Sequence, residues 1–264
     1  MIDIHSHLLP GVDDGADSLD ASIDFLQRLK NVGFNEVVIT PHIYPDLYEN
    51  DPDDLNRRFD EMQKHVEKYF KGDLKIYPGS EVYLAENSVD DIANGNVVTL
   101  NRTGKYILFE IDLTFISPGM EEMIKKLQTK GYHLIWAHPE RNSQAIKDFS
   151  NITKMIDMDV LLQINLGSLN GSYGDEVRHA VIRMLQRNMV HLIGSDCHCT
   201  SRRMGNVKEA MDVLREYADP HYLKLILEKN AKRILEGKIV YPFPYRIKRP
   251  TFFSKVKKFL GFGG

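Results

Sequence analysis

The chain has 264 residues, of which 42% are hydrophobic and 27% charged, so it is long enough to bury a sizeable core and is not composed like a disordered or fibrous protein. A formal net charge of −3 excludes a globally basic nucleic-acid-binding protein. The cysteines, Cys197 and Cys199, are too close in sequence to form a disulfide framework, which predicts a reducing, cytoplasmic setting. No run reaches the roughly 18 apolar residues of a membrane span, so we expect a protein that is neither exported nor membrane-spanning.

Short apolar runs alternate along the chain with longer segments of helical period, which favours an α/β fold with a parallel sheet. We expect strands at residues 1–4, 36–40, 75–81, 106–111, 133–137, 160–164 and 191–194. We expect helices at residues 18–32, 52–70, 84–93, 118–130, 142–158, 175–188, 206–216 and 220–236. Because no linker-like tract interrupts this order, we expect one domain over residues 1–240, followed by a tail at 241–264. The pattern alone leaves a closed barrel and an open doubly wound sheet as alternatives.

Side chains that can bind metal ions stand at or just past the C-terminal ends of the predicted strands. In parallel α/β folds these ends converge on one face, so residues far apart in sequence can share a pocket. The candidates are His5, His7, His42, Glu81, Glu110, His138, Asp196 and His198, with Asp14 from the first loop. A single histidine at a strand end is more often an ordinary polar residue, but the set as a whole predicts one site.

The spacing of these donors indicates the kind of ion. In His5-Ser6-His7 the two imidazoles are two residues apart, so in a strand they point to the same side. Asp196 and His198 repeat that spacing. Mixed histidine and carboxylate ligands suit zinc, manganese or ferrous iron, whereas calcium prefers oxygen ligands alone. The set exceeds the roughly four to six ligands that one such ion takes, which predicts two or three ions sharing bridging carboxylates.

Arginines in the same loops point to a phosphate substrate. Arg141 follows His138 in "AHPER", and Arg203, with Arg202 beside it, follows His198. Three divalent ions with four carboxylates would leave about two net positive charges, which attract a phosphate dianion. An arginine can bind two oxygens of that phosphate at once. Solvated loop arginines are the alternative, and the choice between Arg202 and Arg203 stays open.

The motifs, taken in order, carry a resemblance to a known family. "MIDIHSHLLPGVDDGA", "TPHIYP", "GSEVYL", Glu110, "AHPERN" and "GSDCH" resemble the motif series of the polymerase and histidinol phosphatase (PHP) family over residues 1–237. The first and fifth are similar to its bacterial tyrosine-protein phosphatase branch, which is associated with capsule and exopolysaccharide loci. The resemblance implies a distorted seven-stranded (β/α) TIM-like barrel, the PHP fold, and hydrolysis of phosphotyrosine on a bacterial tyrosine kinase.

The resemblance also assigns roles to residues. It implies that the metal ligands are His5, His7, Asp14, His42, Glu81, Glu110, His138, Asp196 and His198. It makes Arg141 and Arg203 phosphate contacts and implies a three-ion cluster of manganese, with iron, zinc or magnesium as alternatives. Where this chain has Cys197 and Cys199, a small or apolar residue and an asparagine are expected, which leaves the metal preference and the sensitivity to oxidation open.

Metal-assisted hydrolysis of a phosphomonoester is the mechanism that these residues predict. His42 and His198 are candidates to donate a proton, although a ligand imidazole is a poor acid. Cys197 and Arg203 formally satisfy Cys-x5-Arg, the spacing of thiol-dependent tyrosine phosphatases, but the loop contains no glycine to help form a tight cradle of amides. The alternatives are a small-molecule phosphatase, such as one for histidinol phosphate, and a metal-binding interaction module without turnover.

The tail at 241–264 mixes prolines, basic residues and aromatics. Residues 251–260 are compatible with a short basic amphipathic helix on an anionic membrane, which would bring the protein to a membrane surface. A frayed tail, or one packed on the barrel exterior, is the alternative.

Overall fold

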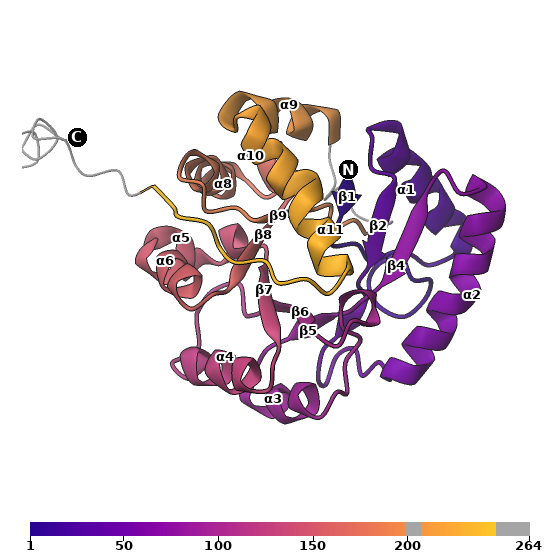
Figure 1. Ribbon diagram of the computed structural model, residues 1–264, viewed down its shortest axis with the longest axis horizontal. Coiled ribbons are helices and arrows are strands. Elements are labelled where there is room, and N and C mark those ends of the chain that lie inside the picture. The colour runs from indigo at the N-terminus through magenta and orange to yellow at the C-terminus, as the bar shows by residue number, and fades with distance from the viewer. Residues whose placement is uncertain (199–206, 247–264) are drawn as a thin grey trace, which may run out of the picture.

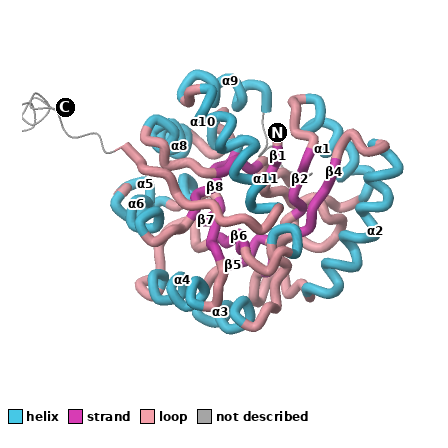
Figure 2. The backbone as a smooth tube through the Cα atoms, viewed as in Figure 1, coloured by secondary structure: helices cyan, strands magenta, loops and turns pink. Residues whose placement is uncertain are grey.

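Parallel strands lie at the centre of the protein and helices surround them, as Figures 1 and 2 show. The computed structural model describes residues 1–198 and 207–246. The strands are β1 (Ile2–Asp3), β2 (Glu36–Ile39), β3 (His42–Ile43), β4 (Lys75–Pro78), β5 (Glu81–Tyr83), β6 (Tyr106–Glu110), β7 (His133–Ala137), β8 (Leu161–Asn165) and β9 (Leu192–Gly194). All their pairings are parallel, which confirms the predicted α/β fold.

The helices follow the predicted order, with two interruptions and one additional short helix at Leu166–Leu169 that was not predicted. They are α1 (Leu19–Asn31), α2 (Pro52–Phe70), α3 (Glu86–Ala93), α4 (Met120–Thr129), α5 (Ser143–Lys147), α6 (Ser150–Asp157), α7 (Leu166–Leu169), α8 (Asp175–Gln186), α9 (Val207–Tyr217), α10 (Pro220–Lys224) and α11 (Asn230–Leu235). The helix predicted at 142–158 is broken at Asp148, whose backbone is extended, and the one at 220–236 contains a π-helical turn at Leu225–Lys229. Ser18 caps α1 as its type predicts, accepting a hydrogen bond from the Ala21 N–H.

One predicted strand is divided into two segments, and another is followed by a short strand, β3, that was not predicted. The strand expected at 36–40 ends at Ile39, and β3 begins after Pro41, which has no N–H to donate to a ladder. The strand expected at 75–81 breaks at Gly79, where an added Cβ would lie 2.8 Å from the Leu100 side chain. The hydrogen-bonded order is therefore β1-β2-β4 in one sheet and β3-β5-β6-β7-β8-β9 in the other.

The ends of the strand order approach each other just beyond β1 and β9. Ser6 and Cys197 form an isolated parallel bridge. The His7 N–H donates to the Cys197 carbonyl at 3.1 Å, and the Asp196 N–H donates to the His5 carbonyl at 2.9 Å. These bonds bring the first donor pair of the chain against the last one.

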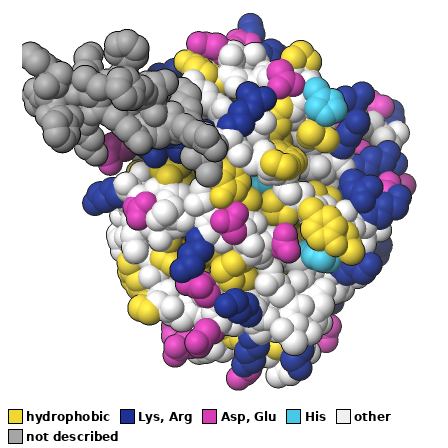
Figure 3. Space-filling view, turned by 60° about the vertical axis from the view of Figure 1, so that its left-hand side comes forward, with side chains coloured by type: hydrophobic (Ala, Val, Ile, Leu, Met, Phe, Trp, Pro, Cys, Tyr) yellow, Lys and Arg dark blue, Asp and Glu magenta, His cyan; other side chains and the backbone are white. Residues whose placement is uncertain are grey.

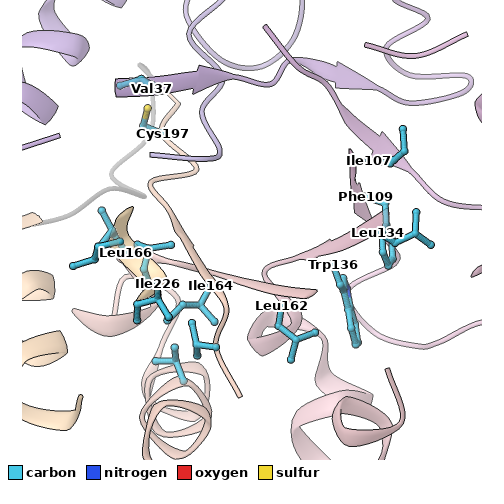
Figure 4. Packing of buried hydrophobic residues seen from close by; sticks show 14 of the residues in the cluster. Val37, Ile107, Phe109, Leu134, Trp136, Leu162, Ile164, Leu166, Cys197 and Ile226 are labelled. Carbon is cyan, nitrogen blue, oxygen red and sulfur yellow. The ribbon is translucent and has the colours of Figure 1, made fainter. Parts of the chain in front are cut away.

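Alternation along the strands separates an inner layer from an outer one. In β6, Tyr106 and Leu108 belong to an inner apolar cluster, whereas Ile107 and Phe109 belong to the outer one. Figure 4 shows outer-layer residues, Trp136 among them, pointing from the strands toward the surrounding helices. The same period places Glu110 on the inner side, above Leu108.

The inner cluster fills the end of the strand ring where the strands begin. It joins Ile2 and Leu192, the first residues of β1 and β9, to Ala231 and Ile234 of α11. Figure 1 shows α10 and α11 lying across the ring of strands. Because this end is closed by packed apolar side chains, the candidate site lies at the opposite end, where the strands finish.

The surface carries both signs of charge, and basic and acidic side chains are interspersed on the face shown in Figure 3. Among the described residues, none of the helices combines the length and the apolar character needed to cross a membrane. The predicted amphipathic segment at 251–260 lies outside the described residues. The division into a domain at 1–240 and a tail stays a prediction.

Candidate metal centre

His5 and His7 turn their Nε2 atoms toward each other just past β1. The two nitrogens lie 3.0 Å apart, and each lies 3.1 Å from Oε2 of Glu81, the first residue of β5. An ion with ligands at about 2.1 Å holds neighbouring donor atoms about 3 Å apart. The three atoms therefore have the spacing of ligands that share one cation.

Asp14, His42 and His198 form a second group around His7. Oδ1 of Asp14 lies 3.1 Å from Nε2 of His198 and 3.6 Å from Nε2 of His42. The rings of His7 and His198 stack with their centroids 4.2 Å apart. Asp14 is the exposed member of this group, so the second group faces the mouth of the site.

Glu81 connects these groups to the remaining donors. Nδ1 of His42 lies 3.3 Å from Oε2 of Glu81 and 3.3 Å from Oε1 of Glu110. Nε2 of His138 lies 2.9 Å from Oε1 of Glu81. Asp196 completes the cluster, with its Oδ1 3.5 Å from Nε2 of His7. All the predicted donors thus lie together, while their roles as metal ligands stay a prediction.

The imidazole rings of His5 and His7 are oriented by hydrogen bonds from their Nδ1 atoms, which face away from the cluster. Nδ1 of His7 donates to Oδ2 of Asp13 at 2.8 Å, and Nδ1 of His5 donates to Oε1 of Gln163 at 2.8 Å. Because these acceptors fix the proton on Nδ1, the lone pair of each Nε2 points into the cluster. Two lone pairs that face each other at 3.0 Å repel unless a proton or a metal ion lies between them.

The burial and charge of the cluster also fit divalent cations. Oε2 of Glu81 and Nδ1 of His42 are buried and make no hydrogen bond within the described part of the chain. Burial, together with Glu81 and Asp196, raises the pKa of Glu110 well above its usual range, a strain that a cation would relieve. Burial lowers the pKa of His42 to about 4, which keeps the imidazole in its neutral, metal-binding form.

Two site residues have left-handed backbone conformations that disfavour ordinary side chains. The φ angles are 38° at His138 and 50° at Asp196. His138 directly follows β7 and Asp196 lies two residues past the end of β9, where the chain turns away from the sheet. Such strain is typical of functional sites, where the surrounding structure holds a side chain in place.

The predicted site omits an amide pair in β8 that joins two of its donors. Nε2 of Gln163 donates to Oδ1 of Asn165 at 2.9 Å, and Nδ2 of Asn165 donates to Oδ2 of Asp196 at 2.5 Å. Gln163 is also the partner of His5, so the pair links the first donor to one of the last. The signal in the sequence is two amides in the otherwise apolar run "LLQIN", on the inner side of the strand.

Arg141 reaches the cluster, as its place after His138 predicts. Its Nη1 lies 3.0 Å from Oδ2 of Asp196, and its guanidinium lies 4.5 Å from the ring centroid of Tyr173. The Tyr173 hydroxyl lies 3.3 Å from the same carboxylate oxygen. Arg202 and Arg203, the other predicted phosphate contacts, lie outside the described residues, as does Cys199.

The fold and the cluster together define the class: a parallel α/β protein with a candidate polynuclear metal centre at one end of its sheets. Within that class, the chain belongs to the CpsB/CapC family of capsular polysaccharide synthesis, whose model matches residues 1–236.

Relatives of known name support this assignment. The chain is 31% identical to the tyrosine-protein phosphatase YwqE of Bacillus subtilis, over 96% of this chain and 99% of that protein. It is 26% identical to the tyrosine-protein phosphatase CpsB of Streptococcus agalactiae, over 90% of this chain and 99% of that protein. The resemblance to tyrosine-protein phosphatases of capsule loci is thereby confirmed.

Solved structures agree with the fold. One described as YwqE from Bacillus subtilis and CpsB from Streptococcus pneumoniae, unique metal-dependent tyrosine phosphatases, matches with a TM-score of 0.84 and 31% identity, covering 94% of this chain and 100% of that one. The histidinol phosphate phosphatase of Lactococcus lactis matches with a TM-score of 0.53 and 13% identity, covering 82% of this chain and 93% of that one. The second match supports the fold alone.

Proposed function

We propose that this protein is a metal-dependent tyrosine-protein phosphatase. The observation that carries the proposal is the convergence of Nε2 of His5, Nε2 of His7 and Oε2 of Glu81 within 3.1 Å of one another, at the strand ends of a chain whose relatives are named tyrosine-protein phosphatases. Arg141 beside this cluster supplies a positive charge for a phosphate group.

The donor set fits a cluster of three divalent ions, and we propose manganese as the metal. The ligands would be His5, His7, Asp14, His42, Glu81, Glu110, His138, Asp196 and His198. Iron, zinc or magnesium would suit parts of the same set. When bound, such ions supply Lewis-acid activation of the phosphate and an acidified water for attack on phosphorus.

The protein's own side chains position the phosphate and its ester. Arg141, and Arg203 or Arg202 from the segment outside the described residues, would hold the phosphate oxygens and stabilise their charge. His42 and His198, grouped with Asp14, are the candidates to donate a proton to the leaving phenolate, but as metal ligands they would be poor acids. With a pKa near 10, tyrosine is a leaving group that needs little such help.

Cys197 lies in the wrong environment for a thiol nucleophile. Cys197 is 0% exposed and belongs to the outer apolar cluster, some of whose members Figure 4 labels with it. Asp196 and His198, on either side of it, instead lie against His7 in the donor cluster. A nucleophilic thiolate needs access to phosphorus and an electropositive setting. This burial supports the metal mechanism over the Cys-x5-Arg alternative.

The partner that we propose is a phosphotyrosine protein, in particular a bacterial tyrosine kinase that controls capsule or exopolysaccharide synthesis. The description of the family, capsular polysaccharide synthesis, supports this context. A tail that contacts the membrane would bring the enzyme close to a membrane-bound kinase, and pelleting with anionic liposomes, with and without residues 249–264, tests that part.

Turnover with and without a chelator tests the proposed function. We expect hydrolysis of a phosphotyrosine peptide in preference to histidinol phosphate, loss of that hydrolysis in EDTA, and retention of it in Cys197→Ser. A preference for histidinol phosphate would assign a small-molecule phosphatase. Activity that survives chelation but is lost in Cys197→Ser would contradict the metal mechanism, and metal binding without any turnover would leave only an interaction module.

A further inference from the structure

Two tyrosines stack beside the donor layer, by which we mean His42 and Glu81 on β3 and β5. The rings of Tyr44 and Tyr83 lie with their centroids 4.0 Å apart and their planes 12° from parallel. Each follows a donor by two residues, Tyr44 after His42 and Tyr83 after Glu81, and the two donors are register partners in β3 and β5. Because strand side chains alternate, Tyr83 lies on the same side of β5 as Glu81, and its stacking with Tyr44 brings both rings to that side.

The tyrosine pair lies next to further residues of the site. Tyr83 is the register partner of Glu110, so it lies beside the third strand that contributes a donor. The ring of Tyr48 stacks on His42 at 5.4 Å, with the two planes 8° apart. The Tyr48 N–H donates to the Tyr44 carbonyl at 2.8 Å, which fixes this loop against the pair.

Apolar side chains are exposed in the two loops that flank the pair. Leu47, three residues after Tyr44, is 61% exposed, and Leu113 and Phe115, after β6, are 37% and 52% exposed. The loop after β6 is held near Arg141, because Nδ2 of Asn142 donates to the carbonyl of Phe115 at 3.2 Å. Exposed apolar side chains therefore occur in the loops after β3 and β6, and the second of these loops is bonded to the residue that follows Arg141, the arginine that would hold a phosphate.

We propose that Tyr44 and Tyr83 determine specificity by packing against the phenyl ring of a phosphotyrosine side chain whose phosphate lies on the donor layer. This inference rests on the proposed function and adds the residues that select an aryl phosphate over an alkyl one. Two residues along a strand correspond to about 6.6 Å, and the ring of a phenyl phosphate begins one bridging oxygen beyond phosphorus. The ring thus reaches the level of the tyrosine pair, whereas a serine phosphate presents no aromatic face there.

The test compares aryl and alkyl ligands on the metal-loaded, full-length protein. We measure kcat/KM for a phosphotyrosine peptide, and inhibition constants for phenylphosphonate and methylphosphonate, in Tyr44→Ala, Tyr83→Ala and Tyr83→Leu. Tyr69→Ala removes an exposed tyrosine of α2 and is the matched control. Metal content and thermal unfolding report the integrity of each variant, and Tyr83→Leu keeps apolar volume where Tyr83→Ala fails to fold.

We expect each substitution to lower kcat/KM for the phosphotyrosine peptide about tenfold, and to weaken phenylphosphonate to a similar degree. The inhibition constant of methylphosphonate should change less than about twofold, because this ligand contacts only the phosphate site. Tyr69→Ala should leave the inhibition constants of both phosphonates unchanged. Equal effects on both phosphonates, or none on either, would overturn the inference while leaving wild-type turnover intact. A wild-type protein that hydrolyses no phosphotyrosine peptide would instead overturn the proposed function, and this inference with it.

Discussion

Nδ1 of His7 donates a hydrogen bond to Oδ2 of Asp13 at 2.8 Å, and the same oxygen accepts the backbone N–H of His42 at 3.0 Å. One buried carboxylate therefore orients His7 and ties the first loop to β3. Asp14, the next residue, points instead to His198 and His42. The two neighbouring aspartates have different functions, since Asp13 supports a candidate ligand from behind and Asp14 is itself a candidate ligand.

Removing the Asp13 carboxylate should weaken metal binding without removing a ligand. We expect Asp13→Ala to lower the affinity for manganese about 10- to 100-fold, because His7 loses the partner that fixes its tautomer and ring orientation. Isothermal titration of chelator-treated protein measures this affinity. Asp24→Ala, on the exposed face of α1, is the control. Equal affinities for wild type and Asp13→Ala would show that His7 needs no orienting carboxylate.

Replacing Arg141 should impair turnover more than metal binding. We expect Arg141→Ala to lower kcat/KM for a phosphotyrosine peptide about 10²- to 10³-fold, as the loss of a contact to developing phosphate charge does elsewhere. Arg141→Lys should recover only part of this, because an ammonium cannot make the paired contacts of a guanidinium. Metal content measured on the same samples is the control, and normal kcat/KM in Arg141→Ala would exclude a role in phosphate binding.

Removing metal should destabilise the protein, because Glu81, Glu110 and Asp196 are then buried close together without a cation. One ion present at a hundred times its Kd contributes about 2.7 kcal/mol, which corresponds to a Tm change of about 5–10 °C for a chain of this size. We expect EDTA to lower Tm by at least this amount and manganese to restore it. In Glu81→Gln, EDTA and manganese should change Tm less than in wild type. A wild-type Tm that changes with neither EDTA nor manganese would contradict the metal centre.

A histidine outside the cluster should make stability depend on pH. His191 is fully buried, its Nδ1 accepts the Leu162 N–H at 3.0 Å, and burial lowers its pKa to about 3. The unfolded chain therefore binds a proton that the folded one does not between pH 6.5 and 3. The contribution of neutral His191 to the free energy of unfolding is complete above pH 6.5 and falls as the pH decreases, by about 2 kcal/mol at pH 5.

Urea unfolding of metal-free protein at pH 7.5 and pH 5.0 measures this contribution. We expect His191→Asn, whose Oδ1 can accept the same N–H, to lose about 2 kcal/mol less than wild type between the two pH values. His65→Asn, on the exposed face of α2, controls for the loss of a histidine. A pH dependence in His191→Asn equal to that of wild type would assign the effect to other groups.

The sequence predicts the site better than it predicts the chain between the donors. His-x-His at the end of an apolar run, and Asp196 with His198, follow from strand alternation and from the convergence of parallel strands, which are local and topological rules. The breaks at Pro41 and Gly79 depend on how two neighbouring strands fit, which a single segment does not reveal. Gln163 and Asn165 lie within a strand, where an apolar context conceals polar residues that face inward.

The tyrosine pair shows the same limit. Neither Tyr44 nor Tyr83 lies in a predicted strand, and only the register of β3 with β5 and the stacking of the two rings show that they lie together beside the donors. The hydrogen bond between His7 and Asp13 likewise depends on the path of the first loop, which a sequence pattern does not specify.

Anomalous diffraction from crystals grown with manganese shows directly whether metal ions occupy the cluster. We expect anomalous peaks within coordinating distance of Nε2 of His5, Nε2 of His7 and Oε2 of Glu81, with further peaks beside Asp14 and Glu110. An absence of peaks among these atoms, in protein that still hydrolyses a phosphotyrosine peptide, would contradict the metal centre.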